Sequence, residues 1–240
     1  MNGSGSEIRE RLAEIRARIA ASAARSGRPA SAVTLIGASK QVAPEQLSEA
    51  LAAGLGDLGE NRVQEALAKF ELLGRVGIQW HLIGPLQRNK IGRALAVFDR
   101  LHGVDDLELA RAIATRAEAA GRRIAVLIEV NVSGEAGKHG VAPAELESVL
   151  EQAAGWPALA LDGLMTLARP VERAEDARRD FVRLRELRDR SEERLGIALP
   201  QLSMGMSGDF EVAIEEGATM VRIGTALFGG RRIDGAANSG

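Results

Sequence analysis

The sequence contains no cysteine and only three histidines, at positions 81, 102 and 139. Without cysteine the chain has no disulfide, no thiolate nucleophile and no thiolate ligand for zinc. Three scattered histidines are also too few to predict a metal centre, so we expect none. The absence of cysteine is compatible with a cytoplasmic protein.

The chain also lacks a strong charge of one sign and a long apolar run. The formal net charge is -2, which gives no global attraction to nucleic acid or to an anionic membrane. The most basic stretch, QRNKIGR at 87–93, has no interleaved aromatic residue and is more typical of a solvated helix face. No apolar run approaches the roughly 20 residues that span a bilayer, and MNGSGS does not resemble a secretion signal. We therefore expect a soluble, cytoplasmic protein that binds neither nucleic acid nor membrane.

What is present is ordinary globular composition in a chain of 240 residues, with 45% hydrophobic and 27% charged residues. No repeat, linker or change of composition divides the chain, so we expect one domain over residues 7–232. The Gly/Ser-rich segments 1–6 and 233–240 are typical of flexible ends. Apolar residues at helical spacing from Glu7 to about Ser26 predict an amphipathic helix before the first strand.

Strand-like and helix-like segments alternate after residue 33. Eight strands are predicted: VTLIGAS at 33, DLGE at 57, QWHLIG at 79, RLHGV at 100, AVLIEVNV at 125, ALDGLMTL at 160, LPQLSMG at 199 and MVRIGTALFG at 220. The first seven precede helical segments that begin near Pro44, Asn61, Leu86, Asp105, Pro143, Glu172 and Ser207. Eight such units predict a single (β/α)8 TIM barrel with an extra N-terminal helix.

Lys40 closes the first predicted strand, where the functional side chains of a barrel gather. Only four of the 31 basic residues are lysines, so arginine is the general surface cation of this chain. An amine at a strand end can form a Schiff base, which a guanidinium cannot. A simple solvated lysine is the alternative interpretation.

A second candidate group follows the last two strands. Ser207 and Gly208 precede a predicted helix, and Gly224 and Thr225 follow the eighth strand. Barrels commonly bind phosphate at this place, through backbone N–H groups and small side chains. Helix capping and turn formation would explain the same residues. An amine and a phosphate site together indicate a phosphorylated aldehyde, either pyridoxal 5'-phosphate (PLP) or a phosphosugar.

From Val33 to Arg231 the sequence resembles the YggS/PROSC family of pyridoxal-phosphate homeostasis proteins, whose fold is similar to the alanine racemase barrel. The resemblance rests on GASK, LGENRVQEA, WHLIGPLQRNK, VNVSGEAGKHG, GLMTL, LSMGMSGDFEVAI and MVRIGTALFG, which occur in this order. It implies a PLP aldimine on Lys40. It further implies cofactor contacts at these residues: Asn61, His81, Lys138, Met165, Ser207, Arg222, Gly224 and Thr225.

Arg222 would face the pyridine nitrogen in this family. An arginine only donates hydrogen bonds, so it would leave that nitrogen unprotonated and make the cofactor a weak electron sink. An ion pair of Arg222 with Glu129 or Glu60 is the alternative. The chain also has no tyrosine. The resemblance to alanine racemase would imply a two-domain dimer that uses a lysine and a tyrosine as opposed acid and base, and this chain departs from that pattern.

These features predict a carrier or regulator of the PLP supply, with apo PLP-dependent enzymes as acceptors, in a monomer or weak dimer. An amino-acid racemase of low activity, using Lys40 with Lys138 or water opposite, is the second hypothesis.

Overall fold

The computed structural model describes residues 4–135 and 137–229. Helix α1 spans Ser4–Arg25 and so begins earlier than the predicted start at Glu7. Residues 4–6, which the sequence assigns to a flexible segment, belong to this helix. Residues 1–3 and the predicted flexible end at 233–240 lie outside the described residues.

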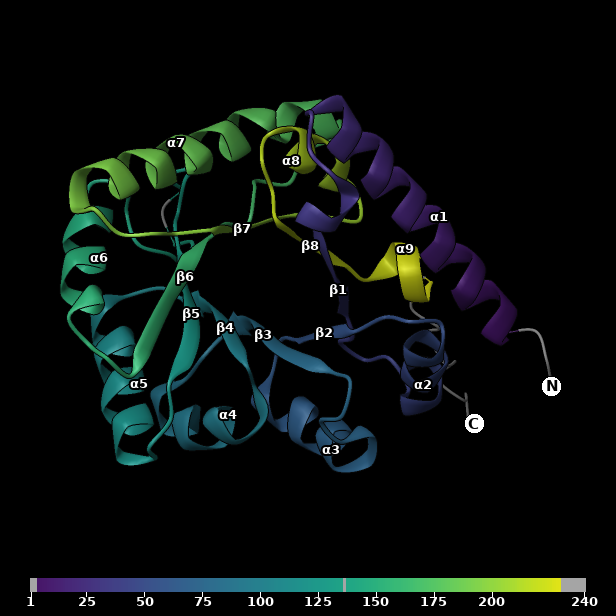
Figure 1. Cartoon of the computed structure of the whole chain (residues 1–240), viewed down its shortest axis with the longest axis horizontal. Coiled ribbons are helices and arrows are strands. Elements are labelled where there is room, and N and C mark those ends of the chain that lie inside the picture. Colours follow the sequence, from purple (N-terminus) through teal and green to yellow (C-terminus); the bar gives the residue numbers. More distant parts are fainter. Residues whose placement is uncertain (1–3, 136, 230–240) are drawn as a thin grey trace, which may run out of the picture.

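Eight parallel strands form a closed barrel in which each strand pairs with the next and β8 pairs with β1 (Figure 1). The strands are β1 Thr34–Ala38, β2 Asp57–Glu60, β3 Gln79–Pro85, β4 Arg100–Val104, β5 Ile124–Glu129, β6 Leu159–Met165, β7 Gln201–Met206 and β8 Met220–Ile223. The predicted (β/α)8 barrel is confirmed, including the short strands DLGE and RLHGV. Their neighbours supply the ladder hydrogen bonds that make such short segments stable as strands.

Helices surround the barrel on its outside (Figure 1). They are α2 Pro44–Ala52, α3 Val63–Leu73, α4 Ile91–Val97, α5 Leu107–Ala119, α6 Leu146–Ala154, α7 Arg178–Leu195, α8 Phe210–Glu215 and α9 Thr225–Phe228, with 3-10 turns at Ala30–Ala32, Arg88–Lys90 and Ala174–Ala177. Within the described residues, no helix has both the length and the apolar composition that crossing a membrane requires.

The eighth strand is shorter than the sequence predicts, because it ends at Ile223 and the segment TALF forms the single turn of α9. The carbonyl oxygen of Gly224 accepts hydrogen bonds from the backbone N–H groups of Leu227 and Phe228. The chain therefore leaves the sheet at Gly224, although the segment that follows is apolar enough to continue a buried strand. A short extra helix after the last strand is a common feature of phosphate-binding barrels.

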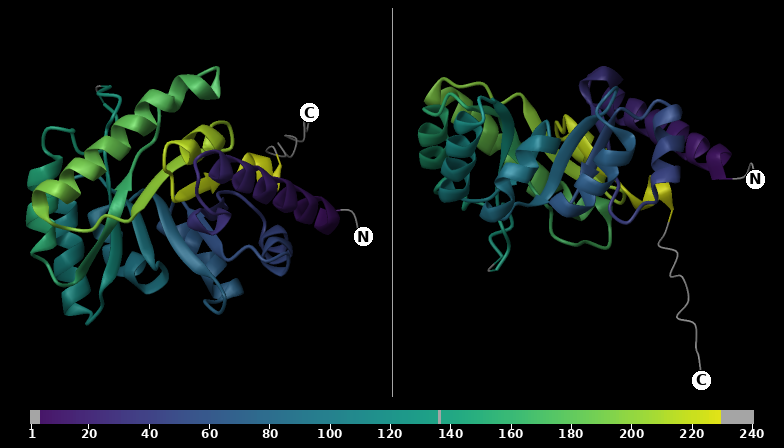
Figure 2. Two further views of the ribbon diagram at one scale, coloured as in Figure 1. Left: turned by 45° about the horizontal axis from the view of Figure 1, so that its top comes forward. Right: turned by 90° about the horizontal axis from the view of Figure 1, so that it is seen from below.

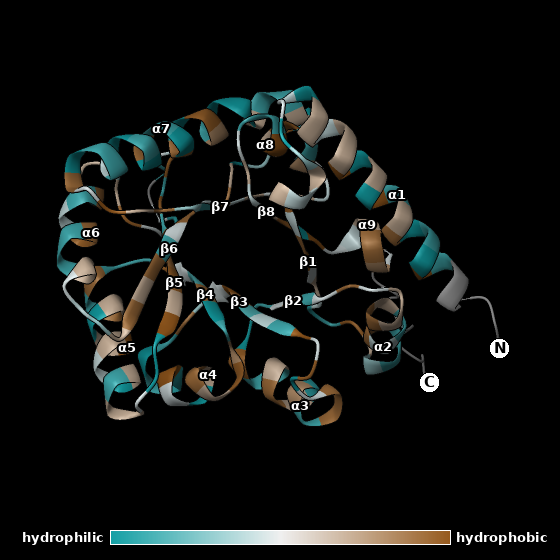
Figure 3. Cartoon of the chain, viewed as in Figure 1, coloured by the Kyte–Doolittle hydropathy of each residue, from teal (hydrophilic) through white to brown (hydrophobic). Residues whose placement is uncertain are grey.

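Apolar residues between the strands and the helices form the main core. On the mostly hydrophilic helix α7 (Figure 3), the side chains of Phe181, Leu184 and Leu187 are buried and that of Leu195 is half-buried. These residues form the apolar side of this charged helix. Helix α7 is thus an outer helix of the barrel.

Helix α1 lies along the outside of the barrel beside α2, α8 and α9 (Figures 1 and 2). Arg18 forms an ion pair with Glu211 of α8 at 3.0 Å, and Arg25 forms one with Glu215 at 2.7 Å. Arg28, which follows α1, donates hydrogen bonds to backbone carbonyl oxygens at the C-terminal end of α8 and beyond. The first helix therefore holds α8, the helix that follows β7, in place.

Asp106 caps helix α5, because its carboxylate accepts a hydrogen bond from the backbone N–H of Leu109 at 2.5 Å. Replacing Asp106 by alanine is expected to lower the free energy of unfolding by about 1 kcal/mol, measured by urea denaturation. Glu108→Ala removes a negative charge from the first turn, two residues after the cap, but removes no cap, and we expect it to cost under about 0.5 kcal/mol. Equal losses in the two variants would contradict a capping role.

Candidate functional site

Lys40 lies in a tight turn directly after β1. The backbone N–H of Val42 donates to the carbonyl oxygen of Ser39 at 3.0 Å, and Gln41 adopts a positive φ of 60°. The side chain of Lys40 is exposed and has no hydrogen bond or ion pair with any residue that the structure describes. The fold thus presents a free amine on an ordered turn at the C-terminal end of the barrel.

A buried polar cluster supports this turn. The carboxylate of Glu60 accepts hydrogen bonds from Ser39 Oγ and Lys69 Nζ, each at 2.5 Å, and Lys69 also donates to the carbonyl oxygen of Ser39. Ser39 and Glu60 are fully buried, and Lys69 is 8% exposed. Sequence reasoning missed Lys69, because a lysine on an amphipathic helix is typical of a solvated position. The cluster fixes the residue that precedes Lys40.

The predicted phosphate residues lie together beside the end of β1. The backbone N–H of Ala226 donates to Ser207 Oγ at 3.4 Å, which joins the loop after β7 to the first turn of α9. A Cβ atom on Gly224 would lie 3.3 Å from the carbonyl oxygen of Ala38, so β8 passes close to β1 there. A Cβ atom on Gly208 would contact nothing within 4 Å. The structure therefore brings Ser207, Gly224 and the adjacent Thr225 near the Lys40 turn.

Arg222 is a buried cation between β1 and β7, paired in register with Ile36 and Met206. Its guanidinium donates hydrogen bonds to Ser203 Oγ and, at 2.9 Å, to the carbonyl oxygen of Thr166. Burial lowers the pKa of Arg222 from its ordinary value to about 10, so the group is still a cation at neutral pH. Sequence reasoning did not assign Ser203, a fully buried serine within β7.

The sequence offered Glu60 and Glu129 as ion-pair partners of Arg222, and among the described residues neither forms that ion pair. Glu60 pairs with Lys69, not with Arg222. Glu129, at the end of β5, interacts with Arg222 electrostatically, and the carboxyl is 6% exposed. Arg222 is thus held by a hydroxyl and a backbone carbonyl.

Two other predicted site residues lie at strand ends. Asn61 follows β2, and its backbone is packed so closely against β3 that a Cβ atom on Gly84 would lie 2.6 Å from its carbonyl oxygen. Met165 ends β6 and is 1% exposed. Both therefore lie at the same end of the barrel as Lys40.

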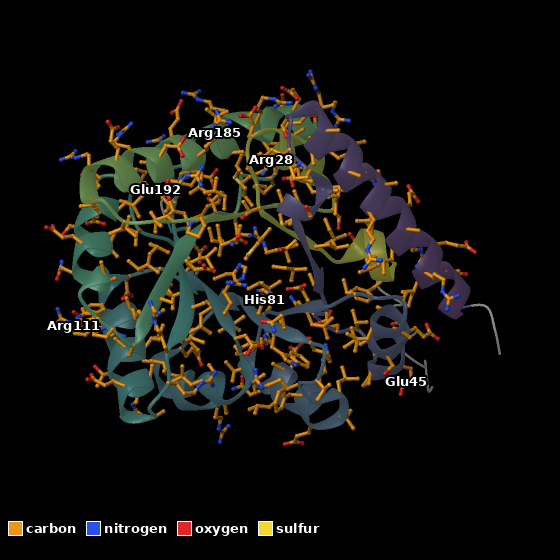
Figure 4. The ribbon with its side chains drawn as sticks, viewed as in Figure 1. Arg28, Glu45, His81, Arg111, Arg185 and Glu192 are labelled. Atoms are coloured by element: carbon orange, nitrogen blue, oxygen red, sulfur yellow. The ribbon has the colours of Figure 1, made fainter. Side chains whose placement is uncertain are left out.

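The remaining two predicted residues make their polar contacts with groups outside the Lys40 turn. His81 is buried inside the ring of strands (Figure 4), and its two ring nitrogens face Asp57 at 2.9 Å and His102 at 3.0 Å. Lys138 lies in the loop after β5 and pairs with Glu135 at 2.7 Å. Both nitrogens of His81 are thus occupied by protein groups, and the Lys138 amine has an acidic neighbour.

Glu129 has an unusual titration. Burial, reinforced by Asp105, raises the pKa of Glu129 from 4.5 to about 6, although Arg222 and His139 oppose the shift. Because the folded state binds this proton more tightly than the unfolded state, Glu129 favours folding most at low pH. This contribution falls as the pH rises from 4.5 to 6.

We expect the wild-type free energy of unfolding, relative to that of Glu129→Gln, to decrease by about 2 kcal/mol between pH 4 and pH 7. Glutamine has a similar shape and does not titrate, so the difference between the two proteins isolates this carboxyl. Urea denaturation across the pH range measures it. A difference that does not change with pH would contradict the raised pKa.

The comparisons with known proteins agree with this arrangement. The family model described as "Alanine racemase, N-terminal domain" matches residues 11–232. The "Pyridoxal phosphate homeostasis protein" of Aquifex aeolicus is 47% identical over 223 residues, which cover 93% of this chain and 98% of the relative. Its counterpart in Escherichia coli strain K12 is 40% identical over 232 residues, covering 94% and 97%.

Solved structures give the same result. PipY of Synechococcus elongatus, described as a COG0325 family member and solved with PLP bound, is 36% identical with a TM-score of 0.81, covering 92% of this chain and 100% of that one. An alanine racemase of Clostridium difficile is 16% identical with a TM-score of 0.74, covering 95% of this chain and 57% of that one, and shows the shared fold alone. The match of the family model and the high identity to full-length relatives place this chain in the YggS/PROSC family.

Proposed function

We propose that this protein binds PLP through a covalent bond between the Lys40 amine and the cofactor aldehyde, and that it acts in PLP homeostasis as a carrier. The observation that carries the proposal is the free Lys40 amine on an ordered turn, with Ser207 and Gly224 beside it. An aldehyde carbon needs a neutral amine to attack it, and the amine of an exposed lysine can reach a ligand without breaking an existing contact.

The residues present fit this cofactor. A phosphate requires hydrogen-bond donors with space around them, and the Ser207 hydroxyl and the open surface at Gly208 provide both. A pyridine nitrogen requires a donor, and Arg222 is a buried one. When bound, PLP supplies an electrophilic aldehyde and a conjugated ring that can accept electrons.

The relatives support the same assignment. Homologous proteins over nearly the whole chain carry the name "Pyridoxal phosphate homeostasis protein", and a relative of 36% identity has been solved with PLP bound. In our proposal, Asn61 and Met165 border the cofactor. Lys138 is a second amine at the edge of the site, and His81 lies beneath the cofactor.

Two features favour storage and transfer over rapid catalysis. Arg222 cannot protonate the pyridine nitrogen, because its guanidinium remains a cation and a donor. The chain contains no tyrosine that could exchange a proton on the face opposite Lys40. A site of this kind holds the cofactor and releases it when another amine displaces Lys40.

The test is a titration of the purified protein with PLP, followed by visible absorption, and then addition of an apo PLP-dependent enzyme. We expect a stoichiometric absorption change and activation of the acceptor enzyme by the loaded protein. Incubation with single enantiomers of amino acids is expected to leave their chirality unchanged. Racemisation that depends on Lys40 would instead make the protein an enzyme.

A further inference from the structure

A continuous chain of hydrogen-bonding groups crosses the interior of the barrel and ends at Arg222. Asp57 Oδ1 lies 2.9 Å from His81 Nε2, His81 Nδ1 lies 3.0 Å from His102 Nε2, and His102 Nδ1 lies 2.9 Å from Ser203 Oγ. Arg222 donates to the same Ser203 oxygen. His81, His102 and Ser203 are fully buried, whereas the Asp57 side chain is 26% exposed. Asp57 begins β2, so the chain runs from the N-terminal end of the barrel toward its mouth.

With both imidazoles neutral, the Asp57 carboxylate and the Arg222 guanidinium at the two ends give every hydrogen bond one direction. Arg222 has no acceptor, so Ser203 Oγ accepts from it and keeps its own proton for His102 Nδ1. His102 is then protonated at Nε2 and donates to His81 Nδ1. His81 is in turn protonated at Nε2 and donates to the Asp57 carboxylate, which only accepts. In this arrangement both imidazoles are neutral and every donor meets an acceptor.

The surroundings of His102 favour its neutral form. Burial lowers the pKa of His102 well below 6.5, and His81, Arg222 and Arg100 lower it further. Arg100 is itself paired with Asp162 at 2.6 Å and therefore does not replace a member of the chain. The arrangement of hydrogen bonds from Arg222 to Asp57 described above requires this neutral form of His102.

We propose that Asp57 is a positioning residue for the cofactor site, and that it acts through His81, His102 and Ser203 to fix the guanidinium of Arg222. Two hydrogen bonds set the plane of that guanidinium, and the one to Thr166 is made by a rigid backbone carbonyl. The other is made by a hydroxyl, which rotates freely unless its proton has a fixed acceptor. Asp57 supplies that acceptor indirectly by setting the tautomers of the two histidines. The proposal rests on the proposed function, because only there does Arg222 meet a cofactor.

The first experiment examines the chain without cofactor. Nitrogen-proton NMR of the untagged protein reports the tautomer of each imidazole, and the sequence contains only three histidines, of which His139 is exposed. We expect His81 and His102 to be neutral and protonated at Nε2, and Nδ1-protonated signals to appear in Asp57→Ala. A wild-type His102 that is protonated at Nδ1, or at both nitrogens, would overturn the proposal.

The second experiment measures the dissociation constant for PLP. Asp57→Ala is expected to raise it about tenfold, the effect of weakening one hydrogen bond to a charged group. Asp57→Asn keeps a neutral acceptor oxygen and should stay within about twofold of wild type, as should the control Asp162→Ala, which removes a carboxylate outside the chain.

The outcomes separate this proposal from the proposed function. If wild type binds PLP and Asp57→Ala binds it equally well, the positioning role is overturned and the proposed function stands. If Asp57→Asn binds PLP as weakly as Asp57→Ala does, PLP binding depends on the negative charge of Asp57 and not on its acceptor oxygen. This result also overturns the proposal. A wild-type protein that binds no PLP overturns both, and the tautomer measurement still reports whether the chain exists.

Discussion

We expect borohydride reduction to trap a pyridoxyl adduct in the PLP-loaded wild-type protein, and we expect the replacement of Lys40 by alanine to abolish it. The adduct requires an amine that can bond to the aldehyde carbon, and reduction converts the labile C=N bond to a stable C–N bond. Lys40 is exposed, and its side chain makes no hydrogen bond or ion pair with the described residues, so we expect its removal to leave the fold intact. Peptide mass mapping after reduction measures the adduct at each lysine.

Two matched variants separate the amine of Lys40 from its charge and from other amines. Lys40→Arg keeps the positive charge but cannot form a Schiff base, so it should also lose the adduct. Lys138→Ala removes the second candidate amine and should keep the adduct on Lys40. An undiminished adduct in Lys40→Ala, carried by Lys138 at the same PLP concentration, would assign the covalent role to the wrong lysine.

Replacing Lys69 by methionine is expected to lower the free energy of unfolding by about 3 to 5 kcal/mol. Methionine is similar in length but leaves the fully buried Glu60 carboxylate without its cation. The second oxygen of that carboxylate, Oε2, is buried and has no hydrogen-bond partner among the described residues. Chemical denaturation with urea measures the loss, and PLP titration tests whether the Lys40 turn also loosens.

The control variants identify the cause. Lys90→Met changes a half-buried lysine for which the described residues include no ion-pair partner, and it should cost less than about 0.5 kcal/mol. The double variant Glu60→Gln with Lys69→Met removes both charges and should recover a large part of the lost stability, since a buried pair costs most when one partner is missing. A loss below about 1 kcal/mol for Lys69→Met alone would mean that water or another group compensates Glu60.

The fold could be predicted from the sequence because hydrophobic patterning and helix-start residues act locally. Even DLGE, which has little strand character alone, could be assigned because a strand was needed between two helices. The exit of the chain at Gly224 could not, because the next four residues are as apolar as a strand. Such a segment leaves the sheet when the carbonyl oxygen of Gly224 accepts hydrogen bonds from the residues that follow it. Those hydrogen bonds form only in the folded chain.

The sequence could predict that Lys40, Ser207 and the buried Arg222 lie at or near strand ends, but it could not predict the residues that support them. Lys40 and Ser207 stand at strand ends, where the barrel fold itself implies function. Lys69 supports Lys40 across a turn, and His102 supports Arg222 across the barrel, so each contact depends on the three-dimensional register of distant segments. A lone histidine or lysine carries no local signal of such a partner.

The attachment of helix α1 to α8 has a consequence for how the protein is made. Arg18 and Arg25 bind residues of α8 that lie about 190 positions later, and β1 pairs with β8 over a similar separation. Contacts of such long range form slowly, because closing a large loop costs entropy before any contact is gained. During synthesis the first helix and strand therefore emerge long before their C-terminal partners exist, and the part of α1 that packs against α8 and α9 stays uncovered until those helices have left the ribosome.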